Sequence, residues 1–111
     1  MNRLPYLESA ILDQRKLEDY CLNAEHPRGQ HKARVFREAL GIEKADAHWL
    51  RSALLAALPR SEAIAMETDA FGARWRCDLR VTRQNRRAVV RMIWIIRTGE
   101  LLPRFVTCWV L

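Results

Sequence analysis

Residues 74–82 read RWRCDLRVT, and they decide the fold because apolar and polar side chains alternate along them. On an extended chain, such alternation gives one apolar face, here made of Trp75, Cys77, Leu79 and Val81. The next apolar run, RAVVRMIWIIR at 87–97, is hydrophobic almost throughout and predicts a strand in the centre of a sheet. The residues between the two runs, RQNR, predict a hairpin turn.

The chain on either side of this pair extends the pattern. Residues 62–70 and 104–110 also read as strands, whereas apolar residues before Pro59 recur with a helical period. That period predicts helices over 15–23, 31–41 and 44–59. We therefore expect an α+β fold in which two or three N-terminal helices pack on a roughly four-stranded antiparallel meander. A single domain should span 1–111, with its helical part at about 14–58 and its sheet at about 62–110.

Composition narrows the function classes. The 111 residues carry a formal net charge of +6, and most of their cations are arginine, the side chain that binds phosphate in a bidentate manner. A basic surface favours a nucleic-acid partner without proving one. No apolar run approaches the roughly 18 residues that span a bilayer. Glu8 and Asp13 interrupt the N-terminal region early, so we expect a cytoplasmic protein with no membrane partner.

Cysteine spacing and the absence of familiar motifs argue against several cofactors. Cys21, Cys77 and Cys108 are odd in number and far apart, which favours reduced, buried thiols over disulfides or a zinc site. The sequence has no Gly-rich phosphate-binding loop, no dinucleotide fingerprint and no nucleophile elbow. We therefore expect neither a metal nor another cofactor.

The stretch HPRGQHKARVF at 26–36 is the first candidate for chemistry. His31 and Lys32 precede Val35 and Phe36 by one helical turn, so we expect both to continue the sheet-facing stripe. The start of a helix also attracts phosphate through its dipole and free N–H groups. The alternative is structural: His31 hydrogen-bonds the preceding loop, and the Lys32 stem packs while its ammonium group reaches water.

The strands supply the other candidates. Arg91 stands within the apolar run 87–97, where it either pairs with a carboxylate such as Asp78 or binds a phosphate. Thr107 is either an ordinary strand former or a phosphate-binding hydroxyl, and a shift of one residue in register would move it to the other face. Trp75 and Trp94 should be core residues, whereas Trp109 could stack on a base. Arg74, Arg76 and Arg80 share the polar face of their strand.

These residues resemble a bacterial family known only as a domain of unknown function, associated with mobile elements and polymorphic toxins. The resemblance covers roughly residues 10–110. It rests on an H-P-x-G-x-x-K-A-x-x-F motif followed by V-T in a late strand. In this chain the motif residues are His26, Pro27, Gly29, Lys32, Ala33 and Phe36, then Val106 and Thr107. More distantly, helices followed by four antiparallel strands resemble the barnase, EndoU, colicin and RelE superfamily of metal-independent ribonuclease toxins.

The more distant resemblance implies cleavage of RNA by attack of the ribose 2'-hydroxyl on the adjacent phosphate. His31 would act as the base or the acid, Lys32 and Arg91 would stabilise charge, and Thr107 would position the phosphate. The residues expected to bind RNA are Arg34, Arg74, Arg76, Arg80 and Arg97. An acidic antitoxin or immunity protein would be the natural partner of so basic a chain.

Two other functions remain open at this stage. The domain could bind nucleic acid or protein without catalysis, through the arginine face of the strand at 74–82, with His31 purely structural. It could also be a small accessory or immunity protein, although those more often carry the opposite charge.

Overall fold

A computed structural model describes residues 2–111 of the chain. The helical part comes first, and its longest helices are α2 (Gln30–Leu40) and α3 (Ala47–Ala57). The shorter elements are η1 (Leu7–Ser9), α1 (Gln14–Lys16), η2 (Leu17–Cys21), η3 (Lys44–Asp46) and η4 (Leu58–Arg60). Within residues 2–111, no helix has the length and apolar character needed to cross a membrane.

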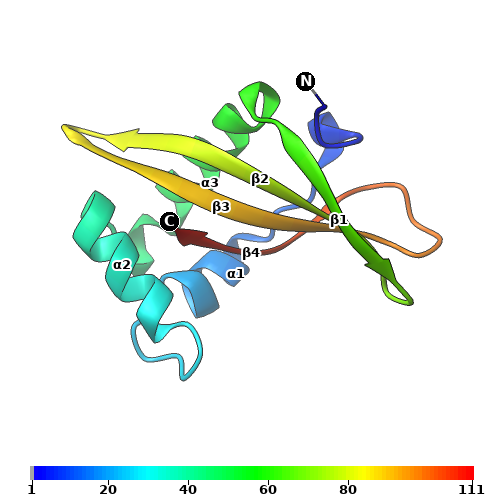
Figure 1. Ribbon diagram of the computed structural model, residues 1–111. Coiled ribbons are helices and arrows are strands. Elements are labelled where there is room, and N and C mark those ends of the chain that lie inside the picture. The colour runs from blue at the N-terminus through cyan, green and yellow to red at the C-terminus, as the bar shows by residue number, and fades with distance from the viewer. Residues whose placement is uncertain (1) are drawn as a thin grey trace.

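The four strands follow in chain order and form one antiparallel sheet. They are β1 (Ala63–Asp69), β2 (Gly72–Arg83), β3 (Arg86–Arg97) and β4 (Arg104–Val110). Their order in the sheet is β1-β2-β3-β4, a meander in which β3 is an inner strand and β4 an edge. Figure 1 shows the two long inner strands running diagonally across the molecule, with α2 and α3 on the same side of the sheet. The expected α+β class and its order of helices and strands are therefore confirmed.

The alternation in β2 produces the two faces of the sheet. Cys77 lies in register with Met92 and Cys108, and all three are fully buried. This helix-side face packs against α2 and α3 through Phe36, Leu50 and Leu54, each with no exposed surface. Trp94 is also fully buried, and Trp75 packs against the same core, as the sequence predicts. The three cysteines are free thiols inside this core, which confirms that expectation.

A β-bulge in β4 decides which of its residues enter the core. Thr107 pairs with Ile93 and Phe105 pairs with Trp94, so Val106 is an extra residue without a partner in β3. Because the extra residue reverses the alternation, Phe105 is 1% exposed, whereas Thr107 and Trp109 leave the core. A regular strand would have placed residues 105, 107 and 109 on one face, as the sequence suggests.

The helices begin and end for local reasons that the sequence partly reveals. Gly41 ends α2 in the left-handed conformation, with φ 67°. Before α3, the Asp46 carboxylate accepts a hydrogen bond from the backbone N–H of Glu43, which forms one half of a capping box around η3. Asp46 is also the N-cap residue of α3, but its side chain makes no capping hydrogen bond to that helix. The helix expected over 15–23 widens after α1 into the π-helical turn η2.

Candidate active site

The ammonium group of Lys32 is the centre of the candidate site. It donates hydrogen bonds to the Tyr20 hydroxyl and to the Thr107 hydroxyl, each 3.1 Å long. It also lies over two aromatic rings, 4.7 Å from the centroid of Tyr20 and 5.2 Å from that of Trp109. Within residues 2–111, no carboxylate lies within ion-pair distance of Lys32. The cation is therefore held by neutral groups, and no carboxylate among these residues competes with an incoming anion for it.

The loop before α2 holds this lysine in place. The His26 ring nitrogen Nδ1 accepts the backbone N–H groups of Arg28 and Gly29, both at 3.0 Å. The same ring packs edge-on against Tyr20, with 4.8 Å between centroids. Gly29 lies so close to the Tyr20 carbonyl that a Cβ atom there would clash with it. These contacts bring the start of α2 against η2 and set Lys32 beside Tyr20.

A buried thiol lies behind the site. The Cys21 Sγ atom is 3.8 Å from the Thr107 hydroxyl oxygen. A hydrogen bond from the Cys108 thiol is the main influence that lowers the pKa of Cys21 to about 7, against the opposing effect of burial; Thr107 and Lys32 lower it further. Burial raises the pKa of the Cys108 thiol well above its usual value. Cys21 has no exposed surface, so it packs behind the Thr107 hydroxyl and is not accessible to a ligand.

A shallow apolar groove opens beside Lys32. It has a volume of about 340 Å³ and lies between the first half of α2 and the end of β4. Its walls are His31, Lys32, Val35, Trp109 and Val110. A flat ligand such as a nucleobase could lie there against the Trp109 side chain.

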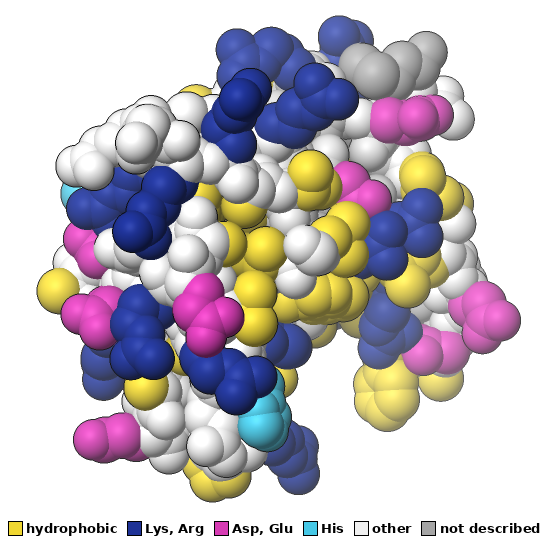
Figure 2. All heavy atoms as spheres, turned by 60° about the vertical axis from the view of Figure 1, so that its left-hand side comes forward, with side chains coloured by type: hydrophobic (Ala, Val, Ile, Leu, Met, Phe, Trp, Pro, Cys, Tyr) yellow, Lys and Arg dark blue, Asp and Glu magenta, His cyan; other side chains and the backbone are white. Residues whose placement is uncertain are grey.

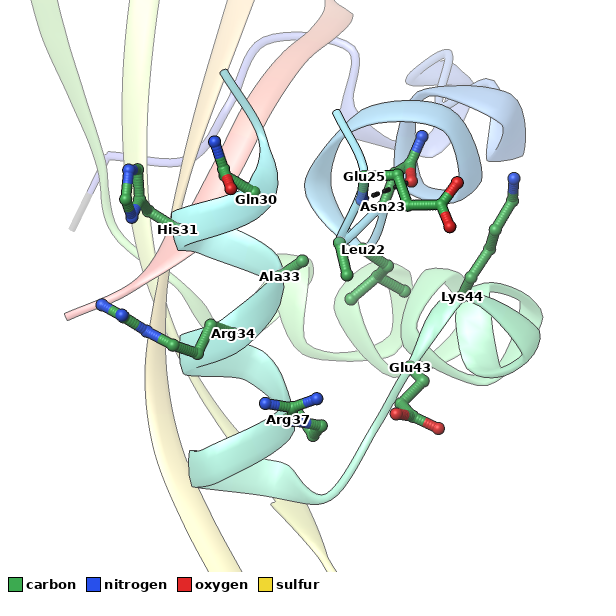
Figure 3. A pocket seen from close by; sticks show the side chains of 11 residues that line it. Leu22, Asn23, Glu25, Gln30, His31, Ala33, Arg34, Arg37, Glu43 and Lys44 are labelled. Carbon is green, nitrogen blue, oxygen red and sulfur yellow. Dashed lines mark hydrogen bonds between the residues drawn. The ribbon is translucent and has the colours of Figure 1, made fainter. Parts of the chain in front are cut away.

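His31 occupies a different position from the one expected. It is exposed, whereas Lys32 is half-buried, so the two do not share the sheet-facing stripe. The buried residues of α2 are Ala33, Phe36 and Leu40, and successive residues advance by about 100° around a helix. His31 consequently projects from the same side of α2 as Arg34, and away from Ala33 (Figure 3). Its place at the rim of the groove leaves it accessible to a ligand.

A second hollow of about 550 Å³ lies on the other side of α2, between that helix and residues 22–25 and 43–44. Figure 3 shows Leu22 and Ala33 turned into it. Its lining carries both acidic and basic side chains, among them Glu25, Arg37 and Lys44. This mixture of charges offers no clear preference for an anion, in contrast to the surroundings of Lys32.

Arg91 is engaged in the ion pair that the sequence offered as its structural alternative. Its Nε and Nη2 atoms donate to the two carboxylate oxygens of Asp78 at 2.8 and 2.9 Å. The hydrogen bond from Arg91 lowers the pKa of Asp78. Arg91 is in register with Trp109 on the neighbouring strand, so it lies close to the groove without contacting Lys32. Of the four expected catalytic residues, the structure brings Lys32 and Thr107 into direct contact.

The arginines expected to bind RNA fall into two groups. Arg34 is exposed on α2, near His31. The strand residues lie on the sheet face opposite the helices, which is the face of Arg91; they are Arg74, Arg76, Arg80 and Arg97. Arg74 is already paired with Asp69 at 2.7 Å. The five residues therefore do not form one continuous binding surface.

Comparison with known families identifies the family of this domain. A family model described as a domain of unknown function, DUF6883, matches residues 3–111. The chain belongs to this family. Membership of an uncharacterised family is thus confirmed, whereas the proposed motif and the kinship of DUF6883 with ribonuclease toxins stay predictions. No curated protein and no solved structure matches the chain.

Tyr20 and Cys21 belong to the candidate site of this DUF6883 domain, and sequence reasoning missed both. In the sequence, Leu17, Tyr20 and Cys21 have the spacing of an apolar helical stripe, and only Leu17 and Cys21 are fully buried. The signal that could have found Tyr20 is the glycine at 29, because a glycine before a helix often marks a close backbone approach. In residues 2–111, no three His, Cys, Asp or Glu side chains gather closely enough to hold a metal ion.

Proposed function

We propose that this domain is a metal-independent endoribonuclease that cleaves RNA through the ribose 2'-hydroxyl. The observation that carries the proposal is the Lys32 ammonium group, held by the hydroxyls of Tyr20 and Thr107, with no carboxylate of residues 2–111 at ion-pair distance. A cation fixed by two hydroxyl groups that accept its hydrogen bonds, at the edge of an apolar groove, suits a phosphate with a base beside it. The proposal draws further support from the distant resemblance to ribonuclease toxins.

Each residue would have a role that follows from its position. Lys32 would stabilise the charge on the pentacoordinate phosphorus, and the Thr107 hydroxyl would orient a phosphate oxygen. Trp109 would stack on the base that enters the groove. His31, exposed at the rim, would accept the proton of the 2'-hydroxyl. The 5'-oxygen that leaves must receive a proton, and Tyr20 is suited to supply it because its oxygen accepts from Lys32 and leaves its own hydrogen free.

Two of the expected roles need qualification. Arg91 could assist the phosphate only by giving up its bidentate bond to Asp78, so we assign it no direct part. Arg34 lies on the same side of α2 as His31 and could hold the RNA backbone next to the groove. The 2'-hydroxyl makes RNA the substrate and spares DNA.

The test is cleavage of total tRNA and ribosomal RNA in the presence of EDTA. The wild-type domain should yield fragments that end in 2',3'-cyclic phosphates, and a DNA strand of the same sequence should stay intact. Lys32→Met should lower the rate by about 100-fold or more, the usual effect of removing one preorganised donor to a developing charge. Lys44→Met removes the same charge at a 57% exposed lysine that does not line the groove, and it should cleave like the wild type. A wild type without activity, or a fully active Lys32→Met, would overturn the proposal.

A non-catalytic binding domain is the second candidate. The arginines on the sheet face opposite the helices favour it, because they lie apart from Lys32 and serve no step of the proposed cleavage. This candidate predicts salt-dependent binding without turnover, and no effect of substitutions at His31.

A further inference from the structure

The sheet face opposite the helices is exposed and mixed in character. Register places Ile64, Arg76 and Ile93 in one row across β1, β2 and β3, and Arg80 and Val89 in another. Ile64 is 42% and Val89 37% exposed, although both are aliphatic strand residues. The helices α2 and α3 pack on the opposite side, as Figure 1 shows. This open face, which we define by these five residues and their row neighbours, therefore presents apolar surface to solvent.

Arginine dominates the polar part of the open face. None of the four strands contains a lysine. Three of the arginines here have carboxylate partners, namely Arg74 with Asp69, Arg91 with Asp78 and Arg104 with Glu100. Within residues 2–111, no carboxylate lies within ion-pair distance of Arg76 or Arg80. Figure 2 shows a face of the molecule with apolar side chains gathered in the middle and Lys and Arg side chains around them.

Arg76 has an unsatisfied donor in the middle of this surface. Its Nε atom is buried and has no hydrogen-bond partner among residues 2–111. Its row neighbour Ile93 is 8% exposed, so the centre of the face is already largely dry. A buried N–H group without a partner is unfavourable, so a carboxylate that drew the Arg76 guanidinium outward would relieve it.

We propose that the open face binds an acidic amphipathic helix of a partner protein. The apolar side of such a helix would cover Ile64, Ile93 and Val89, and its carboxylates would pair with Arg76 and Arg80. Protein–protein interfaces are enriched in arginine and depleted in lysine, which agrees with this face. An RNA strand would gain phosphate contacts here but nothing from the aliphatic surface, which offers no aromatic platform for its bases. A helix would also complete a third layer on a sheet that has helices on one side.

The docked helix would lie next to the Lys32 site. The row of Ile64, Arg76 and Ile93 continues to Thr107, and the row of Asp78 and Arg91 continues to Trp109. A partner on the open face would consequently limit access to the groove from that side. This last consequence rests on the proposed ribonuclease function, whereas binding itself does not.

The experiment uses a synthetic peptide of about 18 residues, roughly 27 Å long as a helix, with a leucine stripe on one side and glutamates elsewhere. Fluorescence anisotropy measures its binding to the full chain, beside a scrambled peptide of equal composition and single-stranded poly(U). The stripe peptide should bind at least ten-fold more tightly than the scrambled one. Since the comparison of the two peptides contains no RNA, its outcome is independent of whether the domain is a ribonuclease.

Two double variants locate the interaction. Arg76→Gln with Arg80→Gln should weaken peptide binding at least ten-fold, because it removes two unpaired cations from the open face. Ile64→Thr with Val89→Thr keeps β-branched side chains in the strands and should weaken it at least five-fold.

The matched control is Arg28→Gln with Arg37→Gln, which changes the charge equally at exposed residues on and before α2 and should bind within two-fold of the wild type. Equal binding of both peptides would mean attraction by charge alone and would overturn the proposal. So would binding of poly(U) that depends on Arg76 and Arg80 while the stripe peptide fails to bind.

Discussion

Replacing Gly29 by alanine tests the contact on which the geometry of the Lys32 site depends. The backbone at Gly29 has φ −90° and ψ −14°, a conformation that alanine adopts without strain. Any cost must therefore come from packing. An added Cβ atom would overlap the Tyr20 carbonyl oxygen and lie 3.0 Å from its carbon and 3.2 Å from the Cδ1 atom of the ring. The first two are backbone atoms and cannot rotate away, so η2 and the start of α2 must separate.

The expected magnitude follows from two opposing effects. Overpacking at a site that cannot relax costs about 1–3 kcal/mol. Alanine also restricts the unfolded chain more than glycine does, which stabilises the folded state by about 0.4–1 kcal/mol. Because the clash is with backbone atoms, the cost lies near the upper end of its range. We therefore expect a net loss of about 2–2.6 kcal/mol, which corresponds to a fall in Tm of roughly 8–10 °C for a domain of this size.

Thermal and urea denaturation followed by circular dichroism measure this loss. Gly99→Ala is an instructive companion, because a Cβ atom there meets nothing within 4 Å while φ is 84°. Its expected cost of about 1 kcal/mol comes from backbone strain alone, far from Lys32. If Gly29→Ala proved as stable as the wild type, or more stable, then η2 and α2 would not be in contact at this point. The placement of Lys32 beside Tyr20 would fall with it.

Further substitutions probe the capping loop, the core and the sheet. His26→Ala should cost about 1–2 kcal/mol, because two backbone N–H groups lose their acceptor, and His26→Asn should restore part of it, as urea midpoints would show. Phe36→Ala should cost about 3–5 kcal/mol by emptying a fully buried position, measured as a fall in Tm. The pKa of Asp78 is lowered in the folded state by its hydrogen bond from Arg91, so this pair stabilises the fold above the unfolded pKa of about 3.9 and less as pH falls below it. The difference in Tm between the wild type and Asp78→Asn should accordingly shrink between pH 6 and pH 3, whereas a constant difference would contradict this reasoning.

The sheet could be predicted because its pattern is simple. Strict alternation at 74–82 and a nearly continuous apolar run at 87–97 permit few arrangements, and both form long paired strands. The fold class follows from the change in period after Pro59. The bulge at Val106 was beyond reach, since a local departure from alternation has no consistent signature in one sequence.

The candidate site was predicted only in part. Lys32 and Thr107, separated by 75 positions, do meet, although the pairing came from a family resemblance and not from spacing. The prediction for His31 was wrong because it took Val35 and Phe36 as the stripe of α2 that faces the sheet. The buried residues of α2 are instead Ala33, Phe36 and Leu40, so the buried stripe includes residue 33 and leaves residue 31 outside it. An error of one residue in phase turns a side chain by about 100°, enough to move it from the sheet to solvent.

The extra residue in β4 lets one short strand satisfy two demands that a regular strand would set against each other. Phe105 fills the core beside Trp94, and two residues later a hydroxyl, not another hydrophobic group, meets the lysine. Deletion of Val106 would restore regular alternation. The side chains before position 106 would then exchange faces relative to those after it. Without Val106, the strand could either bury Phe105 or direct the Thr107 hydroxyl at Lys32, but not both. This one valine therefore links folding to the chemistry at the edge of the sheet.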